Sequence, residues 1–223
     1  LPAMFESTSS MENPERDLAR QIIENTNTNL FLTGRAGTGK TTFLRQIREE
    51  VHKRMVVLAP TGIAAINAGG VTIHSFLQLP FAPFIPGMQF RTDQFRMPDR
   101  KKRLIRSLDL IVIDEISMVR ADLLDSVDAA LRRYRDPMRP FGGVQLLLIG
   151  DLQQLSPVVK DEDRELLSRY YDSEYFFSSH ALQKTPFVTV ELQTVYRQSD
   201  DDFLHLLNAV RNSTIDAELL ARL

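Results

Sequence analysis

The clearest chemical pattern in this sequence spans residues 34 to 41, which read Gly-Arg-Ala-Gly-Thr-Gly-Lys-Thr and match the phosphate-binding pattern G-x-x-x-x-G-K-[ST]. Its glycines let the backbone fold so closely that successive N–H groups face phosphate oxygens. We expect the ammonium group of Lys40 to reach the β- and γ-phosphates of a nucleotide, and the hydroxyl of Thr41 to ligate Mg²⁺. The alternative is a glycine-rich turn that happens to contain a lysine.

Two acidic residues form the second candidate group. Asp114 and Glu115 directly follow an apolar run, Ile-Val-Ile at 111–113, and ligands of open α/β sheets bind beyond the carboxyl ends of strands. Asp114 is expected to hold Mg²⁺ through water, and Glu115 to orient or deprotonate the attacking water. Both could instead cap a helix that begins near Met118, because acids are favourable at helix N-termini.

The predicted cofactors are therefore ATP and Mg²⁺. The residues expected to bind nucleotide are Gly34, Ala36, Gly37, Thr38, Gly39, Lys40, Thr41, Thr42 and Asp114, and those expected to hold the metal are Thr41 and Asp114.

Short apolar runs alternate with segments of helical periodicity along the chain. Runs without polar alternation are typical of strands buried on both faces, as in a parallel sheet flanked by helices. The expected strands are 30–32, 55–59, 110–113, 146–149 and 188–190, and the expected helices include 14–25, 41–53 and 121–134. This order predicts an α/β domain of three layers.

Three regions depart from this rhythm. Residues 1–13 are polar and patternless, and we expect this N-terminal segment to be mobile. Residues 79–103 are rich in proline and show no clear period, which in a compact domain indicates a functional stretch or a small insertion. Residues 213–223 begin a helix that no glycine or proline stops, so we expect the chain to be part of something longer.

The composition excludes several classes of protein. Of the 223 residues, 43% are hydrophobic and 25% are charged, as in ordinary globular domains. No apolar run approaches the roughly 20 residues that cross a bilayer, so we expect no membrane contact. The sequence contains no cysteine, which excludes disulfides and thiolate metal sites. Since the formal net charge is −2, any nucleic-acid surface must be a local patch.

Several motifs in fixed order resemble those of one family. Asp-Glu-Ile-Ser-Met at 114–118 and Gly-Asp-Leu-Gln-Gln-Leu-Ser-Pro-Val at 150–158 resemble motifs II and III of superfamily 1 helicases. Ala-Pro-Thr-Gly-Ile-Ala-Ala at 59–65, with the stretch 70–76, looks like motif Ia of the Pif family, which belongs to the 5′→3′ branch. Residues 192–203 look like that family's motif IV. The resemblance covers most of the chain and implies a RecA-like P-loop ATPase lobe.

The resemblance also implies roles for two residues outside the phosphate loop. Gln154 would sense the γ-phosphate through its amide, although a lone glutamine commonly bonds to loop backbone. Arg197 would bind the terminal phosphate through its guanidinium group; its alternative is a surface ion pair with Asp200 or Asp201. With Lys40 and Glu115, these residues form the predicted catalytic set.

A surface for single-stranded DNA is a further implication of the resemblance. Hydroxyls and amides bind sugar-phosphate without reading sequence, and apolar faces stack on bases. The predicted contacts are Thr61, Gly62, Thr72, His74, Ser75, Pro157 and Val158. Phe76 is a weaker candidate because it fits a core position equally well, and His74 could be an ordinary loop histidine.

The insertion at about 79–103 falls where Pif-like enzymes carry a small 1B wedge, beside the point at which duplex strands part. Its second half is basic and contains Arg91, Arg96, Arg100, Lys101, Lys102 and Arg103. This favours contact with phosphates at a duplex junction, although a charge run is often only a solvated face. The arginines between 132 and 139 are interpreted as solvated helix surface.

Two features of the family are missing. The family places a glutamine ahead of the phosphate loop to read adenine; here that position falls near Asp17, the nearest glutamine is Gln21, and no adenine reader is assigned. Nothing matches the second RecA-like lobe, so residues 14–223 are expected to form the first lobe only. Because differential nucleotide affinity between open and closed states drives each step, we expect this lobe alone not to unwind DNA.

The leading interpretation is the N-terminal ATPase lobe of a monomeric Pif-type DNA helicase that moves 5′→3′ on single-stranded DNA. A bacterial cytoplasmic location is expected because no organelle-targeting segment is visible. A small-molecule kinase would leave the motifs at 70–76 and 150–158 unexplained. A non-catalytic nucleotide switch is disfavoured by the intact Glu115.

Overall fold

The computed structural model describes residues 13–35, 39–88, 96–153 and 156–192, and its centre is a six-stranded sheet in the order β3-β2-β4-β5-β1-β6. Every pair of neighbouring strands is parallel. The strands are β1 (Asn29–Thr33), β2 (Met55–Ala59), β3 (Val71–Thr72), β4 (Leu110–Ile113), β5 (Gln145–Gly150) and β6 (Phe187–Glu191). The α/β class with a parallel sheet, predicted from the apolar runs, is confirmed.

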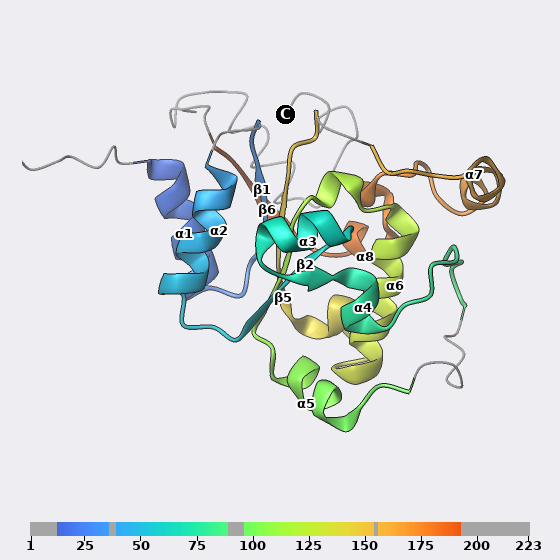
Figure 1. Ribbon diagram of the computed structural model, residues 1–223, viewed down its shortest axis with the longest axis horizontal. Coiled ribbons are helices and arrows are strands. Elements are labelled where there is room, and N and C mark those ends of the chain that lie inside the picture. Colours follow the sequence, from blue (N-terminus) through green and yellow to red (C-terminus); the bar gives the residue numbers. More distant parts are fainter. Residues whose placement is uncertain (1–12, 36–38, 89–95, 154–155, 193–223) are drawn as a thin grey trace, which may run out of the picture.

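Strand β5 lies between the two strands whose carboxyl ends carry the candidate chemistry. Leu147 of β5 pairs with Leu30 of β1 on one side and with Val112 of β4 on the other. In Figure 1, β1 and β5 run toward the same upper edge of the domain. The phosphate loop after β1 and the acidic pair after β4 therefore meet at one edge, across the end of β5.

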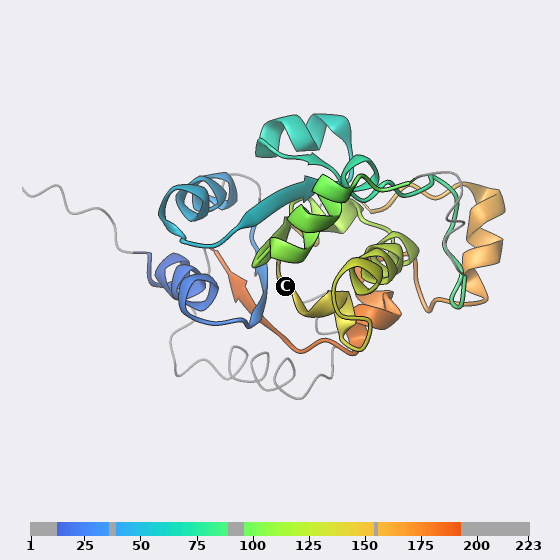
Figure 2. The same ribbon diagram turned by 90° about the horizontal axis from the view of Figure 1, so that it is seen from below.

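Alternate residues of each central strand enter two separate cores. Leu30, Val112 and Leu147 belong to one hydrophobic cluster, whereas Phe31 and Ile111 belong to the other. Helices α1 (Pro14–Asn25) and α2 (Lys40–Glu50) pack on the first face, and α3 (Gly62–Ala68) adds to it. The opposite face is covered by α4 (Ile73–Leu77), α5 (Asp99–Ser107), α6 (Ala121–Tyr134) and α8 (His180–Gln183). Figures 1 and 2 show the two helical layers.

Short elements that the periodicity did not reveal begin at polar caps. Thr61 accepts a hydrogen bond from the N–H of Ala64 and starts α3, and Thr72 accepts one from Ser75 and starts α4. These helices have 7 and 5 residues, too short to display a period of 3.6. The other elements are α7 (Asp161–Ser168) and three 3₁₀ turns, η1 (Ile116–Met118), η2 (Pro140–Gly143) and η3 (Phe176–Ser178).

The predicted insertion divides into two parts. Residues 79–88, which we call the arm, contain no helix or strand. Helix α5 begins at Asp99, within a stretch in which the sequence showed no period. It is held against the domain by Ile105 and by Leu108, just after its end, which both pack into the hydrophobic core. Within the described ranges, no helix is long and apolar enough to span a bilayer.

Candidate nucleotide and DNA sites

The phosphate loop is described at both of its ends, at Gly34 and Arg35 after β1 and at Gly39 before α2. Gly34 is buried at the end of β1. Gly39 has a φ of +91°, a left-handed conformation that glycine adopts without steric cost, and its carbonyl accepts the N–H of Phe43 at 2.8 Å. Helix α2 therefore begins at Lys40, with its N-terminal amides at the site expected for phosphate. Thr41 and Thr42, in the same first turn, are exposed.

Lys40 bends back onto its own loop. Its Nζ donates to the carbonyl oxygen of Gly34 and, at 3.3 Å, to that of Arg35. Burial lowers the pKa of this ammonium group, while the charges of Asp151, Glu115 and Asp114 oppose the change. The negative charges of three carboxylates at the ends of β4 and β5 thus favour the charged form of the lysine. Lys40 must turn away from the loop carbonyls to reach a phosphate.

The acidic pair is held at the end of β4 by its backbone. The N–H of Asp114 donates to the carbonyl of Leu58 at 2.8 Å, and the N–H of Glu115 donates to Oδ1 of Asp114 at 2.9 Å. Glu115 has a φ of +53°, which is uncommon for a residue other than glycine and is typical of functional sites. Burial raises the pKa of both carboxyl groups, and the charge of Asp114 raises that of Glu115 further.

Close packing links this acidic turn to the end of β5. A Cβ atom on Gly150 would stand 2.8 Å from Cγ2 of Ile116 and 3.3 Å from the backbone nitrogens of Ile116 and Ser117. Only glycine fits at this approach without displacing the turn. The start of the 150–158 motif therefore lies directly against η1, the turn that follows Glu115.

The donor set at this edge fits a magnesium ion that keeps part of its water shell. Mg²⁺ binds protein through one or two oxygen ligands and completes its octahedron with water and phosphate. Thr41 and Asp114 offer one hydroxyl and one carboxylate, both on described elements. No group of three or more acidic or histidine side chains in the described ranges forms a metal cage of its own.

Six predicted residues lie outside the described ranges. They are Ala36, Gly37, Thr38, Arg91, Gln154 and Arg197. Their roles remain predictions from the sequence.

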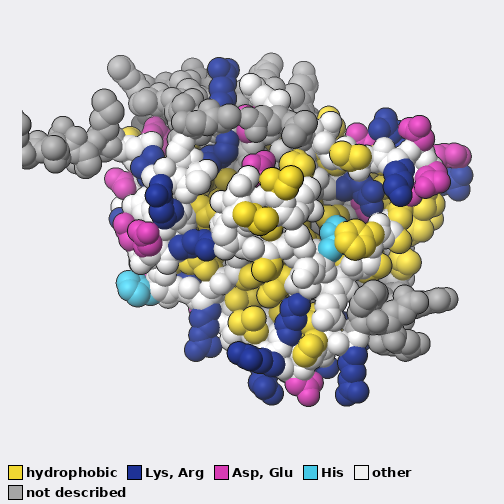
Figure 3. Space-filling view, viewed as in Figure 1, with side chains coloured by type: hydrophobic (Ala, Val, Ile, Leu, Met, Phe, Trp, Pro, Cys, Tyr) yellow, Lys and Arg dark blue, Asp and Glu magenta, His cyan; other side chains and the backbone are white. Residues whose placement is uncertain are grey.

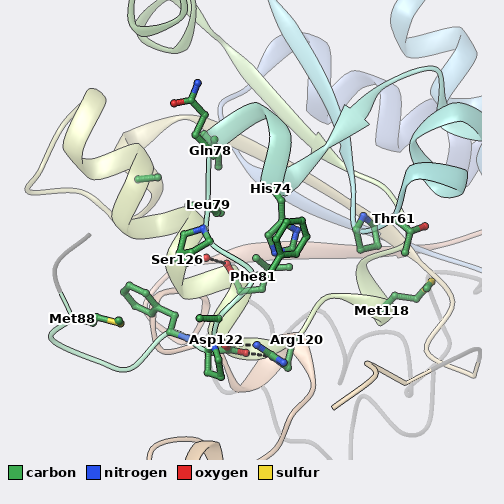
Figure 4. A pocket seen from close by; sticks show the side chains of 18 of the residues that line it. Thr61, His74, Gln78, Leu79, Phe81, Met88, Met118, Arg120, Asp122 and Ser126 are labelled. Atoms are coloured by element: carbon green, nitrogen blue, oxygen red, sulfur yellow. Dashed lines mark hydrogen bonds and ion pairs between the residues drawn. The ribbon is translucent and has the colours of Figure 1, made fainter. Parts of the chain in front are cut away.

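Three of the predicted DNA contacts line one cavity of about 630 Å³ between the arm and α6 (Figure 4). Thr61, His74 and Val158 are its predicted members; Phe81, Met118 and Arg120 also line it. Val158 is 88% exposed, and the hydroxyl of Thr61 already caps α3. Gly62, Thr72 and Ser75 lie outside the lining, on the neighbouring α3, β3 and α4 respectively.

Two rings form a stacked pair at this cavity. The rings of His74 and Phe81 have centroids 4.4 Å apart and planes 15° from parallel. Phe81 is 85% exposed, so it presents an aromatic surface to any ligand of the cavity. No sequence pattern identifies Phe81 as a functional residue, because only the path of the arm places it against His74.

An ion pair lies close to the stacked rings. Arg120 donates through Nε and Nη2 to the carboxylate of Asp122, whose side chain is only 1% exposed. Burial lowers the pKa of His74, and the positive charge of Arg120 lowers it further. His74 therefore contributes a neutral imidazole near neutral pH.

Two apolar residues differ in what they can offer to DNA. Pro157 is buried, so it presents no face to a base, and its prediction as a stacking residue is not supported. Phe76 is 6% exposed in the core cluster, and Nζ of Lys101 lies 5.3 Å from its ring centroid. The core interpretation of Phe76 is therefore the right one.

The basic residues near residue 100 lie on α5, away from the nucleotide edge. Figure 3 shows dark-blue side chains gathered at the lower edge of the molecule, where Figure 1 places α5. Arg100, Arg103 and Arg106 of this helix are exposed. Lys101 instead donates to the carbonyl of Ser75 at 3.0 Å, so part of the charge run anchors α5 to α4.

A parallel sheet with a phosphate loop after β1 and an acidic pair after β4 defines a RecA-like domain of the P-loop class. A family model described as PIF1-like helicase matches residues 12–219. The chain therefore belongs to the PIF1-like helicase family, as its motifs predicted.

Relatives and solved structures agree with this assignment. The chain is 36% identical over 210 residues to the ATP-dependent DNA helicase PIF1 of Saccharomyces cerevisiae, covering 92% of this chain and 23% of that protein. It is 36% identical over 200 residues to human PIF1, covering 87% of this chain and 29% of that protein. Bacteroides Pif1 bound to ssDNA superposes with a TM-score of 0.75 at 43% identity, covering 93% of this chain and 48% of that one. The chain thus spans less than a third of these curated relatives.

Proposed function

We propose that this chain is the first motor lobe of an ATP-dependent DNA helicase and that it binds ATP with Mg²⁺ at the edge formed by β1, β4 and β5. Lys40 and the amides of α2 would hold the phosphates, Thr41 and Asp114 the metal, and Glu115 the attacking water. A solved relative, Bacteroides Pif1 in complex with ADP-AlF3 and ssDNA, superposes with a TM-score of 0.76 at 43% identity. That complex supports the nucleotide site.

One observation supports a coupling between the nucleotide site and the DNA cavity. The turn η1 begins after Glu115 and ends at Met118, which lines the DNA cavity. A shift of Glu115 toward a bound nucleotide is therefore transmitted through three residues to the cavity wall. A small-molecule kinase would have no use for such a connection.

Single-stranded DNA would enter the cavity beside the arm. Thr61 and the exposed start of α3 would contact sugar-phosphate, while Phe81, on its His74 support, and Val158 would face bases. Exposed arginines of α5 would meet phosphates of a duplex junction. Two Pif1 helicases coordinate at forked dsDNA in a solved relative of 42% identity. The state proposed for the full-length protein is a monomer.

Unwinding with 5′→3′ polarity would belong to a full-length protein in which a second RecA-like lobe closes on a site that already includes Arg197 and Gln154 of this lobe. Two lobes are needed because the step comes from closure around the nucleotide. Among solved structures, Bacteroides Pif1 is 43% identical to this chain and Candida albicans Pif1 30%, which supports a bacterial source. The cytoplasmic location stays a prediction from the sequence.

The decisive measurement is ATPase rate in a full-length protein, with and without single-stranded DNA. We expect many-fold stimulation by DNA, and Glu115→Gln should lower the stimulated rate by about a hundredfold or more while nucleotide still binds. Glu165→Gln, at a side chain that is 80% exposed on α7, is the matched control and should change neither. Turnover that ignores DNA but responds to a small-molecule acceptor would replace this proposal with the kinase.

The separate lobe provides a second test. Residues 1–223 alone should not separate a 5′-tailed fluorescent duplex, because nothing closes on the nucleotide from the other side. Robust unwinding by this chain would contradict the requirement for a second lobe.

A further inference from the structure

A cationic side chain from α1 crosses to the end of the phosphate loop. A Cβ atom placed on Gly39 would stand 2.7 Å from Nη2 of Arg16 and 3.8 Å from its Cζ. The guanidinium group therefore lies directly against Gly39, and the missing side chain of that glycine leaves the space that it occupies. Arg16 belongs to the first turn of α1, which Asn13 caps through its Oδ1 at 3.2 Å from the N–H of Arg16.

The guanidinium group has no acidic partner among the described residues. Its Nε is buried and makes no hydrogen bond there. Two nearby side chains do have acidic partners: Arg20, one turn further along α1, lies 3.9 Å from Glu50, and Nδ1 of His52 lies 3.4 Å from Glu24. The neighbouring acids Glu15 and Asp17 form no ion pair with it.

Positive charge gathers at this end of the phosphate loop without a facing acidic side chain among the described residues. The N-terminus of α2 carries a partial positive charge, and Lys40 follows Gly39 directly, so an arginine placed there repels its surroundings. A buried donor without an acceptor also destabilises the fold. Both costs disappear when an anion lies at the start of α2, because a guanidinium group forms strong hydrogen bonds with phosphate oxygens.

We propose that Arg16 is a nucleotide-binding residue that donates to the phosphate chain, beside Gly39 and on the side opposite the acidic pair. This proposal rests on the nucleotide site proposed above and adds a second cation to it. Because Arg16 would bind the phosphates rather than the base, it would strengthen nucleotide binding without a glutamine that reads adenine. The site should then favour ADP over GDP only modestly.

The test compares Arg16→Gln with Arg20→Gln in a full-length protein, in the absence of DNA. Calorimetry with ADP, GDP and pyrophosphate, each with Mg²⁺, would give the affinities. Arg16→Gln should weaken all three by about tenfold or more, as expected for a hydrogen bond to a charged group. Arg20→Gln, whose guanidinium group pairs with Glu50, should bind them like the unchanged protein.

Thermal unfolding separates ligand binding from a structural role. Without nucleotide, Arg16→Gln should unfold at the same or a higher temperature, since it removes an unpaired cation, and the rise on adding ADP should shrink. Unchanged affinity for pyrophosphate would overturn the proposal, as would a lower unfolding temperature with unchanged ADP binding. A loss confined to ADP would assign Arg16 to the base instead and would also overturn it. A protein that passes this test but ignores DNA would contradict only the helicase function.

Discussion

The buried carboxylate of Asp122 accepts the backbone N–H of Phe84 at 2.9 Å, and this bond fixes the arm to the first turn of α6. The same carboxylate accepts two hydrogen bonds from the guanidinium group of Arg120, which follows η1 by two residues. The arm is therefore attached to the chain segment that leads from the water-activating candidate Glu115. The proposed nucleotide and DNA sites share this short connection.

Removing the charge of Asp122 should loosen the arm. Asp122→Asn keeps the shape but breaks a pair whose acidic side chain is 1% exposed, leaving Arg120 with only the distant Asp163 at 3.9 Å. We expect the free energy of unfolding to fall by about 3 kcal/mol, as for buried ion pairs that lose one partner. Half-saturation of the ATPase by single-stranded DNA should shift to higher DNA concentration, with the basal rate less affected.

Urea denaturation and ATPase titrations with DNA would measure the two effects of Asp122→Asn. Glu165→Gln again provides the control, because its ion pair with Arg169 is exposed. A protein that is destabilised but has an unchanged DNA titration would show that the attachment of the arm has no part in DNA binding.

Truncating Phe81 should weaken DNA binding without affecting stability. The ring is 85% exposed and stacks on His74, so its loss removes a base-stacking face and almost no core contact. Stacking of a base on an aromatic ring contributes about 1–3 kcal/mol, which corresponds to roughly five- to a hundredfold in affinity. Fluorescence anisotropy with a labelled oligonucleotide would measure the change in Phe81→Ala. Met138→Ala, at an 84% exposed side chain outside the cavity lining, should bind normally, and equal affinities would remove Phe81 from the DNA site.

Stability should depend on the protonation of His74. Burial and the charge of Arg120 lower its pKa, against the opposing charge of Asp122, so the folded protein binds this proton less readily than the unfolded chain, in which the group titrates near pH 6.5. Neutral His74 therefore contributes fully to the free energy of unfolding above pH 6.5. This contribution is lost as the pH falls through 6.5 toward the lower pKa of the folded state. His74→Gln should reduce the decline in unfolding free energy over this window. Urea unfolding between pH 5 and pH 7.5 would measure it, and identical declines in both proteins would exclude His74 as the cause.

The sequence alone predicted five of the six strands and the candidate nucleotide-binding residues, because both depend on local patterns, whereas the two-residue strand β3 was not predicted. Helix α6 begins and ends where its periodicity predicts, and β2 and β4 match their apolar runs residue for residue. The glycine-rich loop needs its own backbone and one following helix to bind phosphate, so Lys40 and Thr41 could be identified from spacing alone.

Only the tertiary structure determined which residues distant in the sequence pack beside the candidate site residues. The rest of α1 and all of β1 separate Arg16 from Gly39 in sequence, and the packing of α1 beside α2 brings them together. Likewise the arm carries Phe81 to His74 and Phe84 to Asp122 without any periodic signal. Long-range contacts of irregular segments depend on where a side chain or a lone N–H finds its partner, and this information does not reside in the spacing of neighbouring residues.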